Sequence, residues 1–305
     1  MSSRPARPGV TEHPLGASLY HYARLMRLDR PIGIWLLLWP MLWALWIAGE
    51  GRPQAAVFSI MVIGVVVMRS AGCVINDWAD RDLDPHVERT RERPLAAGQV
   101  SPQEALVLFA ALSLVAVALV LQLNRLTQLL AVGGALLTVV YPFMKRFISA
   151  PQLVLGAAFG WAVPMAFAAE TGAVPRLAWL LWLTVVIWAL IYDTMYAMAD
   201  RADDLRVGVK STAILFGSAD VFIVSLLMII LVLGLALAGQ LAGLGPWYYG
   251  ALLVASLLLF KERRLIAGRE PGACFAAFLH SHWVGAVVFA GIVLDFTFRP
   301  LQAIP

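Results

Sequence analysis

Long apolar runs, separated by short polar connections, dominate this chain. About 20 apolar residues in a helix cross the hydrocarbon core of a bilayer, and the pattern predicts nine such helices near residues 32–48, 54–75, 103–122, 127–144, 151–169, 177–195, 219–239, 245–260 and 275–297. The longest connection, residues 76–102, is too short for a soluble domain. We therefore predict an all-α, polytopic membrane protein with one transmembrane domain at residues 20–298. A polar, weakly patterned arm at 1–19, compatible with disorder, precedes it, and a short tail at 299–305 follows.

Composition supports lipid as the main solvent of the chain. Apolar residues make up 61% of the sequence, charged residues 14%, and the mean hydropathy is +0.79. Soluble domains are about 45–50% apolar and about 25% charged. We therefore expect the bilayer itself to be a partner of this chain, and we expect no nucleic-acid partner.

Basic residues concentrate on alternate connections. The N-terminal arm and the second, fourth, sixth and eighth connections carry 18 of the 23 lysines and arginines: Arg4, Arg7, Arg24, Arg27, Arg30, Arg81, Arg89, Arg91, Arg93, Lys145, Arg146, Arg201, Arg206, Lys210, Lys261, Arg263, Arg264 and Arg269. Cytoplasmic loops of membrane proteins carry such an excess. The pattern predicts a cytoplasmic N-terminus and, with nine spans, an external C-terminus.

Eight of the eleven aspartates fall in two short stretches at cytoplasmic ends of predicted spans. The first runs Asn76-Asp77-Trp78-Ala79-Asp80-Arg81-Asp82-Leu83-Asp84, where the i, i+3, i+7 spacing of Asp77, Asp80 and Asp84 predicts one helical face. The second stretch likewise predicts one stripe, formed by Asp193, Tyr196, Asp200, Asp203 and Asp204.

Carboxylates gathered at one membrane depth need opposing charge and usually mark function. Mg²⁺ typically takes one or two carboxylates, several waters and substrate phosphate oxygens, so the two stripes indicate carboxylate, Mg²⁺ and phosphate in series. Solvated acidic loops that only end helices are the alternative. Two single-face acidic stripes, with the other loops nearly free of acids, favour the site.

The two acidic stretches also repeat along the chain. Asp77-x-x-Asp80 and Asp200-x-x-Asp203 share their spacing and lie four predicted spans apart. This suggests two four-helix repeats that face each other across a central cavity, with a ninth helix added.

At these residues the chain resembles the UbiA superfamily of membrane prenyltransferases, most closely its bacterial 4-hydroxybenzoate polyprenyltransferases. The first family motif, N-D-x-x-D-x-x-x-D, matches Asn76, Asp77, Asp80 and Asp84. The second matches Tyr192-Asp193-Thr194, Tyr196-Ala197-Met198, Asp200, Asp203-Asp204 and Gly208-Val209-Lys210-Ser211-Thr212. Leu28-Asp29-Arg30-Pro31-Ile32-Gly33, Arg89-Thr90 and Arg93-Pro94-Leu95 also match. The likeness covers about residues 20–295, and it departs at His280-Ser281-His282, where similar proteins tend to have asparagines; we interpret this segment as a polar helix start.

The resemblance implies an enzyme of ubiquinone biosynthesis in the cell inner membrane, multi-pass, with its site open to the cytoplasm. It would join polyprenyl diphosphate to C3 of 4-hydroxybenzoate, releasing diphosphate. The implied Mg²⁺ ligands and catalytic residues are Asp77, Asp80, Asp84, Asp193, Asp200, Asp203 and Asp204. The implied substrate-binding residues are Arg30, Arg69, Asn76, Lys145, Arg146, Tyr196 and Lys210.

Arg69 lies inside a predicted span, two turns before Asn76 on nearly the same face. We consider two roles for this charge: it pairs with the carboxylate of the benzoate, or it pairs with the aspartate cluster. A purely structural buried ion pair is the third interpretation.

Two other functions share some of these features. A UbiA-type enzyme with another aromatic or quinone-precursor acceptor has the same aspartate motifs. An ion-coupled transporter also has intramembrane acids and internal repeats, although transporter acids usually lie near the middle of the membrane. A soluble isoprenyl synthase with similar Asp-rich helices is excluded by the composition.

Overall fold

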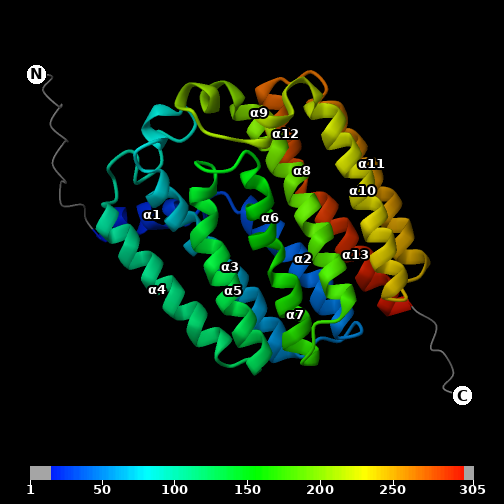
Figure 1. Ribbon diagram of the computed structural model, residues 1–305. Helices are drawn as coiled ribbons and strands as arrows, with labels where there is room; N and C mark the ends of the chain where they lie inside the picture. Colours follow the sequence, from blue (N-terminus) through cyan, green and yellow to red (C-terminus); the bar gives the residue numbers. More distant parts are fainter. Residues whose placement is uncertain (1–14, 299–305) are drawn as a thin grey trace, which may run out of the picture.

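The computed structural model describes residues 15–298, and every regular element in that range is a helix (Figure 1). The prediction of an all-α chain is confirmed for these residues. The polar arm was predicted at 1–19; its residues 1–14 lie outside the described part, as does the tail at 299–305. Residues 15–19 belong to helix α1, so the prediction of an unstructured arm was wrong for them.

The helices follow one another in this order: α1 (Leu15–Leu25), α2 (Ile32–Ala48), α3 (Ala55–Asp80), η1 (Asp84–His86), α4 (Pro102–Val120), α5 (Arg125–Met144), α6 (Pro151–Gly160), α7 (Ala162–Thr171), α8 (Arg176–Val207), α9 (Thr212–Phe216), η2 (Gly217–Ala219), α10 (Asp220–Leu241), α11 (Pro246–Ile266), α12 (Pro271–His280) and α13 (His282–Phe298). Each of the nine predicted spans is helical.

Seven helical segments of the described chain are long and apolar enough to cross a membrane. The other two predicted spans differ for identifiable reasons. Helix α2 has only 17 residues, and α11 ends in a charged turn that contains Lys261, Glu262, Arg263 and Arg264. The count of nine membrane crossings, the repeats and the orientation of the N-terminus stay predictions.

Two predicted spans are each broken into two helices. Pro164 lies in the first turn of α7, and a proline cannot donate a hydrogen bond to the carbonyl four residues earlier, here that of Gly160, the last residue of α6. The second break lies at Ser281, whose hydroxyl bonds to the carbonyl of Ala277 and to the buried Glu262 of α11. His282 begins α13 as expected, but His280 ends α12 and its Nδ1 lies 3.0 Å from Glu262.

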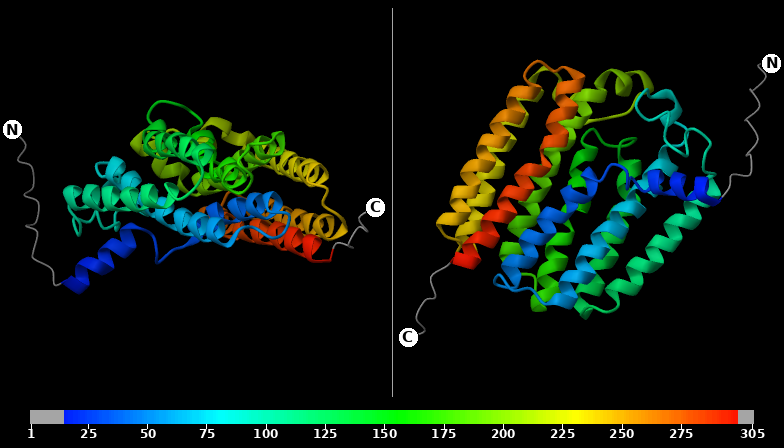
Figure 2. Two further views of the ribbon diagram at one scale, coloured as in Figure 1. Left: turned by 90° about the horizontal axis from the view of Figure 1, so that it is seen from below. Right: turned by 180° about the vertical axis from the view of Figure 1, so that it is seen from behind.

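Successive long helices run in alternating directions. The connections that follow α3, α5, α8 and α11 therefore gather at one end of the molecule, and α1 lies beside that end (Figures 1 and 2). Both acidic stretches and most basic connections lie at this end. The helices thus alternate in direction as the distribution of basic connections requires.

Large aromatic side chains fix the centre of the bundle. Trp43 of α2 stacks on Trp188 of α8 with 5.3 Å between ring centroids, and both are buried. The indole N–H of Trp43 donates to the carbonyl of Gly285 in α13, at 3.0 Å. A Cβ at Gly285 would lie 2.6 Å from Trp188, so only glycine permits this close approach of α13 to α8.

A buried aspartate joins three segments at the acidic end. Asp220, at the start of α10, is completely buried and accepts hydrogen bonds from Arg201 of α8 and from Arg269, which lies just before α12. The Arg269 Nε to Asp220 distance is 2.9 Å. Because Arg201 is on the helix that carries the second acidic stretch, this cluster fixes the end of α8 against α10 and α12.

We expect Asp220→Asn to destabilise the fold, because it removes the charge that two guanidinium groups share. The loss should be about 2 kcal/mol, less than the cost of breaking a fully buried pair, since both arginines keep some solvent contact. Thermal unfolding in detergent measures it. Asp82→Asn, at a side chain that is 74% exposed, is the control and should leave the midpoint unchanged; equal midpoints for both variants would contradict the assignment.

Candidate functional site

A cavity of about 890 Å³ opens at the acidic end of the bundle. Its walls come from α1, α2 and α3 on one side and from α8 and α12 on the other. The 81–101 connection, the end of α5, helix α6 and the connection after α8 complete it. Six of the seven predicted metal ligands line it, namely Asp77, Asp80, Asp84, Asp193, Asp200 and Asp204. Residues more than 100 positions apart in the sequence thus share one space.

The first acidic stretch is only partly helical. Helix α3 ends at Asp80, so Asp77 and Asp80 occupy its last turn, whereas Asp84 begins the short 3-10 helix η1. The prediction of a single helical face was wrong for Asp84. The chain turns after Asp80, and contacts with the loop, not helical spacing, bring the buried Asp84 to the cavity.

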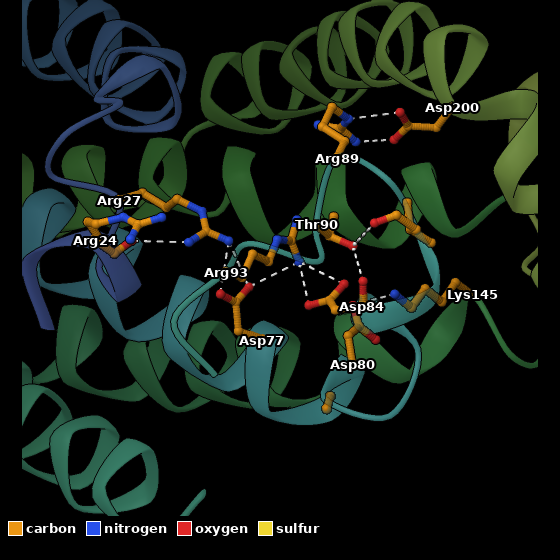
Figure 3. A network of polar contacts seen from close by, with 12 residues as sticks. Arg24, Arg27, Asp77, Asp80, Asp84, Arg89, Thr90, Arg93, Lys145 and Asp200 are labelled. Carbon is orange, nitrogen blue, oxygen red and sulfur yellow. Dashed lines mark hydrogen bonds and ion pairs between the residues drawn. The ribbon is translucent and has the colours of Figure 1, made fainter. Parts of the chain in front are cut away.

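Arginines hold the first stretch together (Figure 3). Arg27, just after α1, donates to both carboxylate oxygens of Asp77 at 2.9 Å. Arg93, from the 81–101 connection, donates to Asp77 at 3.1 Å and to Asp84 at 2.9 Å. Arg27 has a φ of 60°, uncommon for a non-glycine residue. One guanidinium therefore bridges two aspartates, and a second also binds Asp77.

Asp80 has a different partner. One of its oxygens forms an ion pair with Lys145, which follows the end of α5 (Figure 3). Its other oxygen, Oδ1, is buried without a hydrogen-bond partner. A buried carboxylate oxygen without a partner is costly, so it can accept a further ligand.

The second acidic stretch lies entirely on α8, which continues to Val207, well beyond the predicted end at 195. Arg89 forms a bidentate ion pair with Asp200 (Figure 3). It also donates to the hydroxyl of Tyr196. The Arg89 guanidinium also lies 4.0 Å from the centre of the Tyr196 ring. Asp203 does not line the cavity; it forms a 3.3 Å pair with Arg206 at the surface side of the helix.

Burial and charge shift the pKa values of the loop residues. Burial raises the pKa of Asp84 to about 6, against the opposing effect of Arg93. Burial alone would lower the pKa of Arg93, but Asp77 and Asp84 outweigh it and raise that pKa above its ordinary value. The aspartates thus outweigh burial at Arg93, whereas burial outweighs the arginine at Asp84.

The predicted substrate-binding residues divide into two groups. Arg30, Arg69, Asn76, Lys145, Tyr196 and Lys210 line the cavity. Arg146 is absent from the described lining: its guanidinium caps the carbonyl of Ala79 at the end of α3. Arg30 is 75% exposed and lies 3.7 Å from Asp29, so it stands at the cavity rim.

Sequence reasoning gave no site role to three arginines that contact the aspartates: Arg27, Arg89 and Arg93. All three were used only as evidence for the orientation of the chain in the membrane, so their ion pairs with the aspartates were not predicted. Arg89 and Arg93 stand five and nine residues after Asp84, inside the segment that resembles the family. Their position close after the first acidic motif, within that segment, could have indicated a site role for Arg89 and Arg93.

The carboxylates of the cavity fit Mg²⁺ if waters and phosphate oxygens supply its other ligands. Among the described residues, no three acidic, histidine or cysteine side chains converge closely enough to hold a metal ion by themselves. Mg²⁺ needs only one or two carboxylates when waters and phosphate oxygens complete its shell. The unpartnered Oδ1 of Asp80 and the facing carboxylates of α8 provide that donor set.

The chain is similar to known proteins over most of its length. It is 55% identical over 294 residues to the 4-hydroxybenzoate octaprenyltransferase of Saccharophagus degradans, which covers 96% of each chain. It is 58% identical over 275 residues to the protein of the same name from Methylococcus capsulatus, with 90% of this chain and 94% of that chain covered.

Solved structures share the fold. The apo structure of a UbiA homolog from Aeropyrum pernix K1 matches with a TM-score of 0.75 and 26% identity, over 85% of this chain and 97% of that one. A UbiA homolog from Archaeoglobus fulgidus bound to GPP and Mg²⁺ matches with a TM-score of 0.66 and 19% identity, over 89% and 99%. The second likeness shows the fold alone.

The sequence resemblance is confirmed by a family match that covers most of the bundle. The model of the UbiA prenyltransferase family matches residues 37–290, which include both acidic stretches and the helices between them. With relatives more than half identical along nearly their whole length, this polytopic membrane protein belongs to the UbiA prenyltransferase family.

Proposed function

We propose that this protein transfers a polyprenyl group from polyprenyl diphosphate to C3 of 4-hydroxybenzoate, ortho to the hydroxyl, and releases diphosphate. The observation that carries the proposal is that both acidic stretches line the same cavity. In each stretch an arginine forms an ion pair with an aspartate. Relatives of 55% and 58% identity named 4-hydroxybenzoate octaprenyltransferase support the acceptor and the ubiquinone pathway that this name implies.

The donor's diphosphate would lie between the two acidic walls. Arg27, Arg89 and Arg93 present forked guanidinium groups there, and such forks bind phosphate oxygens in pairs. Lys145 adds a compact charge beside Asp80. We assign Mg²⁺ binding to the predicted aspartates that line this space, with Asp203 placed farther out on α8. Bound Mg²⁺ would neutralise charge on the diphosphate as a Lewis acid.

The reaction breaks the allylic C1–O bond, and its electron pair leaves with the diphosphate. The C3 carbon of the ring bonds to C1 and then loses its proton to the released diphosphate, to an aspartate or to water, which restores aromaticity. The chain's basic residues stabilise the departing charge because they are already in place. Phe159, Tyr192 and Phe278 line the cavity, where they exclude water from the allylic cation and present ring faces to it.

Arg69 is our candidate for the acceptor's carboxylate. It lines the cavity, lies 5.4 Å over the ring of Phe159, and its Nε is buried without a hydrogen-bond partner. Within the described residues no carboxylate forms an ion pair with it, although Asp77 and Asp193 lie near enough to act on its charge. A side chain at Gly33 would overlap the guanidinium, so the absence of a side chain there allows Arg69 to adopt this position.

We further propose that the protein lies in the cell inner membrane with the cavity open to the cytoplasm. The basic connections gather at the cavity end of the bundle (Figure 1), and lysine and arginine favour the cytoplasmic side. A charged donor head group then meets the site from the cytoplasm, while its apolar chain stays at membrane depth.

The first test is product formation by the purified protein in liposomes with octaprenyl diphosphate, 4-hydroxybenzoate and Mg²⁺. We expect 3-octaprenyl-4-hydroxybenzoate, lost on addition of EDTA and reduced about 10²–10³-fold in Asp77→Ala. Loss of a Mg²⁺ ligand would weaken the charge stabilisation of the leaving group, and one such stabilising group is typically worth about 10²–10³. Mass spectrometry of the extracted lipids measures the product.

The alternatives give different results in the same assay. Consumption of the donor only with another aromatic or quinone-precursor acceptor would keep the family and overturn the acceptor. No consumption with any acceptor would contradict a transferase and favour an ion-coupled transporter.

A second test separates the two substrates. Arg69→Ala should weaken 4-hydroxybenzoate binding by about tenfold or more while prenyl diphosphate binding stays unchanged, because a buried carboxylate loses its charged partner. Isothermal titration with each substrate separately measures both affinities.

Arg146→Ala is the matched control, since that arginine contacts a backbone carbonyl outside the cavity lining. Unchanged affinity of Arg69→Ala for both substrates would refute the role. Equal losses for both substrates would indicate general disruption and would also count against it.

A further inference from the structure

A buried polar cluster lies where the charged C-terminal part of α11 meets the break between α12 and α13. Its centre is the carboxylate of Glu262, which is completely buried. The Nδ1 of His280 lies 3.0 Å from one carboxylate oxygen, and the hydroxyl of Ser281 lies 3.3 Å from the other. None of these three is among the described residues that line the cavity between the acidic stretches, which we call the polar cavity.

The imidazole of His280 also links Glu262 to a lysine. Its second ring nitrogen, Nε2, lies 3.1 Å from the ammonium group of Lys261. An ammonium group can only donate hydrogen bonds, so we assign Nε2 as an acceptor and place the ring proton on Nδ1, which donates it to Glu262. A neutral imidazole thus connects a lysine to a buried carboxylate, which would be costly without such partners. Lys261, Glu262, His280 and Ser281 together form what we call the Glu262 cluster.

The Glu262 cluster fixes the last turn of α12. This helix runs from Pro271 to His280 and packs against α8 and α11 (Figure 1). Ser281 interrupts the chain between α12 and α13, and its hydroxyl also lies 3.2 Å from the carbonyl of Ala277, one turn earlier in α12. The end of α12 is therefore tied to α11 through two consecutive residues.

The turn of α12 that the cluster fixes also forms part of the wall of the polar cavity. Phe275 and Phe278, five and two residues before His280, line this cavity. The rings of Phe278 and Tyr196 pack in a T-shaped arrangement with 4.8 Å between their centroids. The guanidinium of Arg89 lies 5.8 Å from the centre of the Phe275 ring. Both phenylalanines therefore support the contact between Arg89 and Tyr196.

We propose that the Glu262 cluster is a positioning device for the transfer reaction and that it acts through Phe278. The proposal rests on the proposed function, since that function gives Phe278 a ring face toward the allylic cation and Arg89 a role at the departing diphosphate. The cluster touches no reacting atom. It holds the end of α12 so that Phe278 stays against Tyr196, and loss of the cluster lets this ring move away from the reaction site.

The first test removes the imidazole. In His280→Ala we expect kcat for prenyl transfer to fall about tenfold, because small displacements of groups at a reaction site are costly. The KM for 4-hydroxybenzoate should change less than about twofold, since Arg69 lies on α3, away from the cluster. His282→Ala is the matched control: the Nδ1 of this neighbouring histidine lies 2.9 Å from the carbonyl of Leu279, outside the cluster. Steady-state kinetics in liposomes measure all three proteins.

A double-mutant cycle shows whether the effect passes through Phe278. His280→Ala should add less than about twofold to the loss of kcat that Phe278→Leu already causes, because the two changes break the same connection. Simple damage to the fold would instead multiply the two losses. Ser281→Ala is a milder change that removes one of the groups next to Glu262, so we expect kcat to fall about two- to fivefold. It serves the same test if His280→Ala does not fold.

The outcomes separate a positioning role from a structural one. A loss of kcat in His280→Ala or Ser281→Ala that is absent in His282→Ala, and that largely disappears in the Phe278→Leu background, supports the proposal. Losses that multiply with that of Phe278→Leu, or an unchanged kcat in both cluster variants, would overturn it. Failure of the proposed function is distinguishable, since the unmodified protein would then form no prenylated 4-hydroxybenzoate.

Discussion

The pairing of buried carboxylates with basic side chains is the constraint on which the polar cavity depends. Asp77, Asp80, Asp84 and Asp200 are each removed from most solvent, and each has an arginine or lysine partner. An isolated carboxylate in such a place costs several kcal/mol. Because the partners come from the segment after α1, from the 81–101 connection and from the end of α5, these pairs hold otherwise separate segments over the ends of α3 and α8.

The basic side chains of these ion pairs can also bind a ligand in the cavity. Each guanidinium that holds a carboxylate also faces the cavity, where a diphosphate would compete for it. Arg93 bridges two aspartates, and Arg89 links Asp200 to Tyr196. The charges are therefore preorganised around the space for the head group, and little reorientation is needed when a ligand enters.

Below the charges, the bundle changes from polar to apolar within a few residues. Arg69, Tyr141 and Phe159 line both the polar cavity and a second, mostly apolar cavity of about 400 Å³. The rigid frame around them comes from the stacked Trp43 and Trp188 and from close helix contacts that need glycine. The polar cavity and the apolar cavity therefore share a boundary at these three side chains.

The sequence by itself determined the helical class, because apolar runs of membrane length leave no other way to satisfy the backbone. It also pointed to the aspartates that line the cavity, since helical spacing and family motifs can be read from neighbouring residues. The tertiary structure alone decided what lies opposite them. Arg27 and Arg93 reach Asp77 from 50 and 16 residues away, Asp84 leaves the helical face because α3 ends at Asp80, and Asp203 turns away from the cavity. Such pairings depend on where loops fold in space, which no local periodicity encodes.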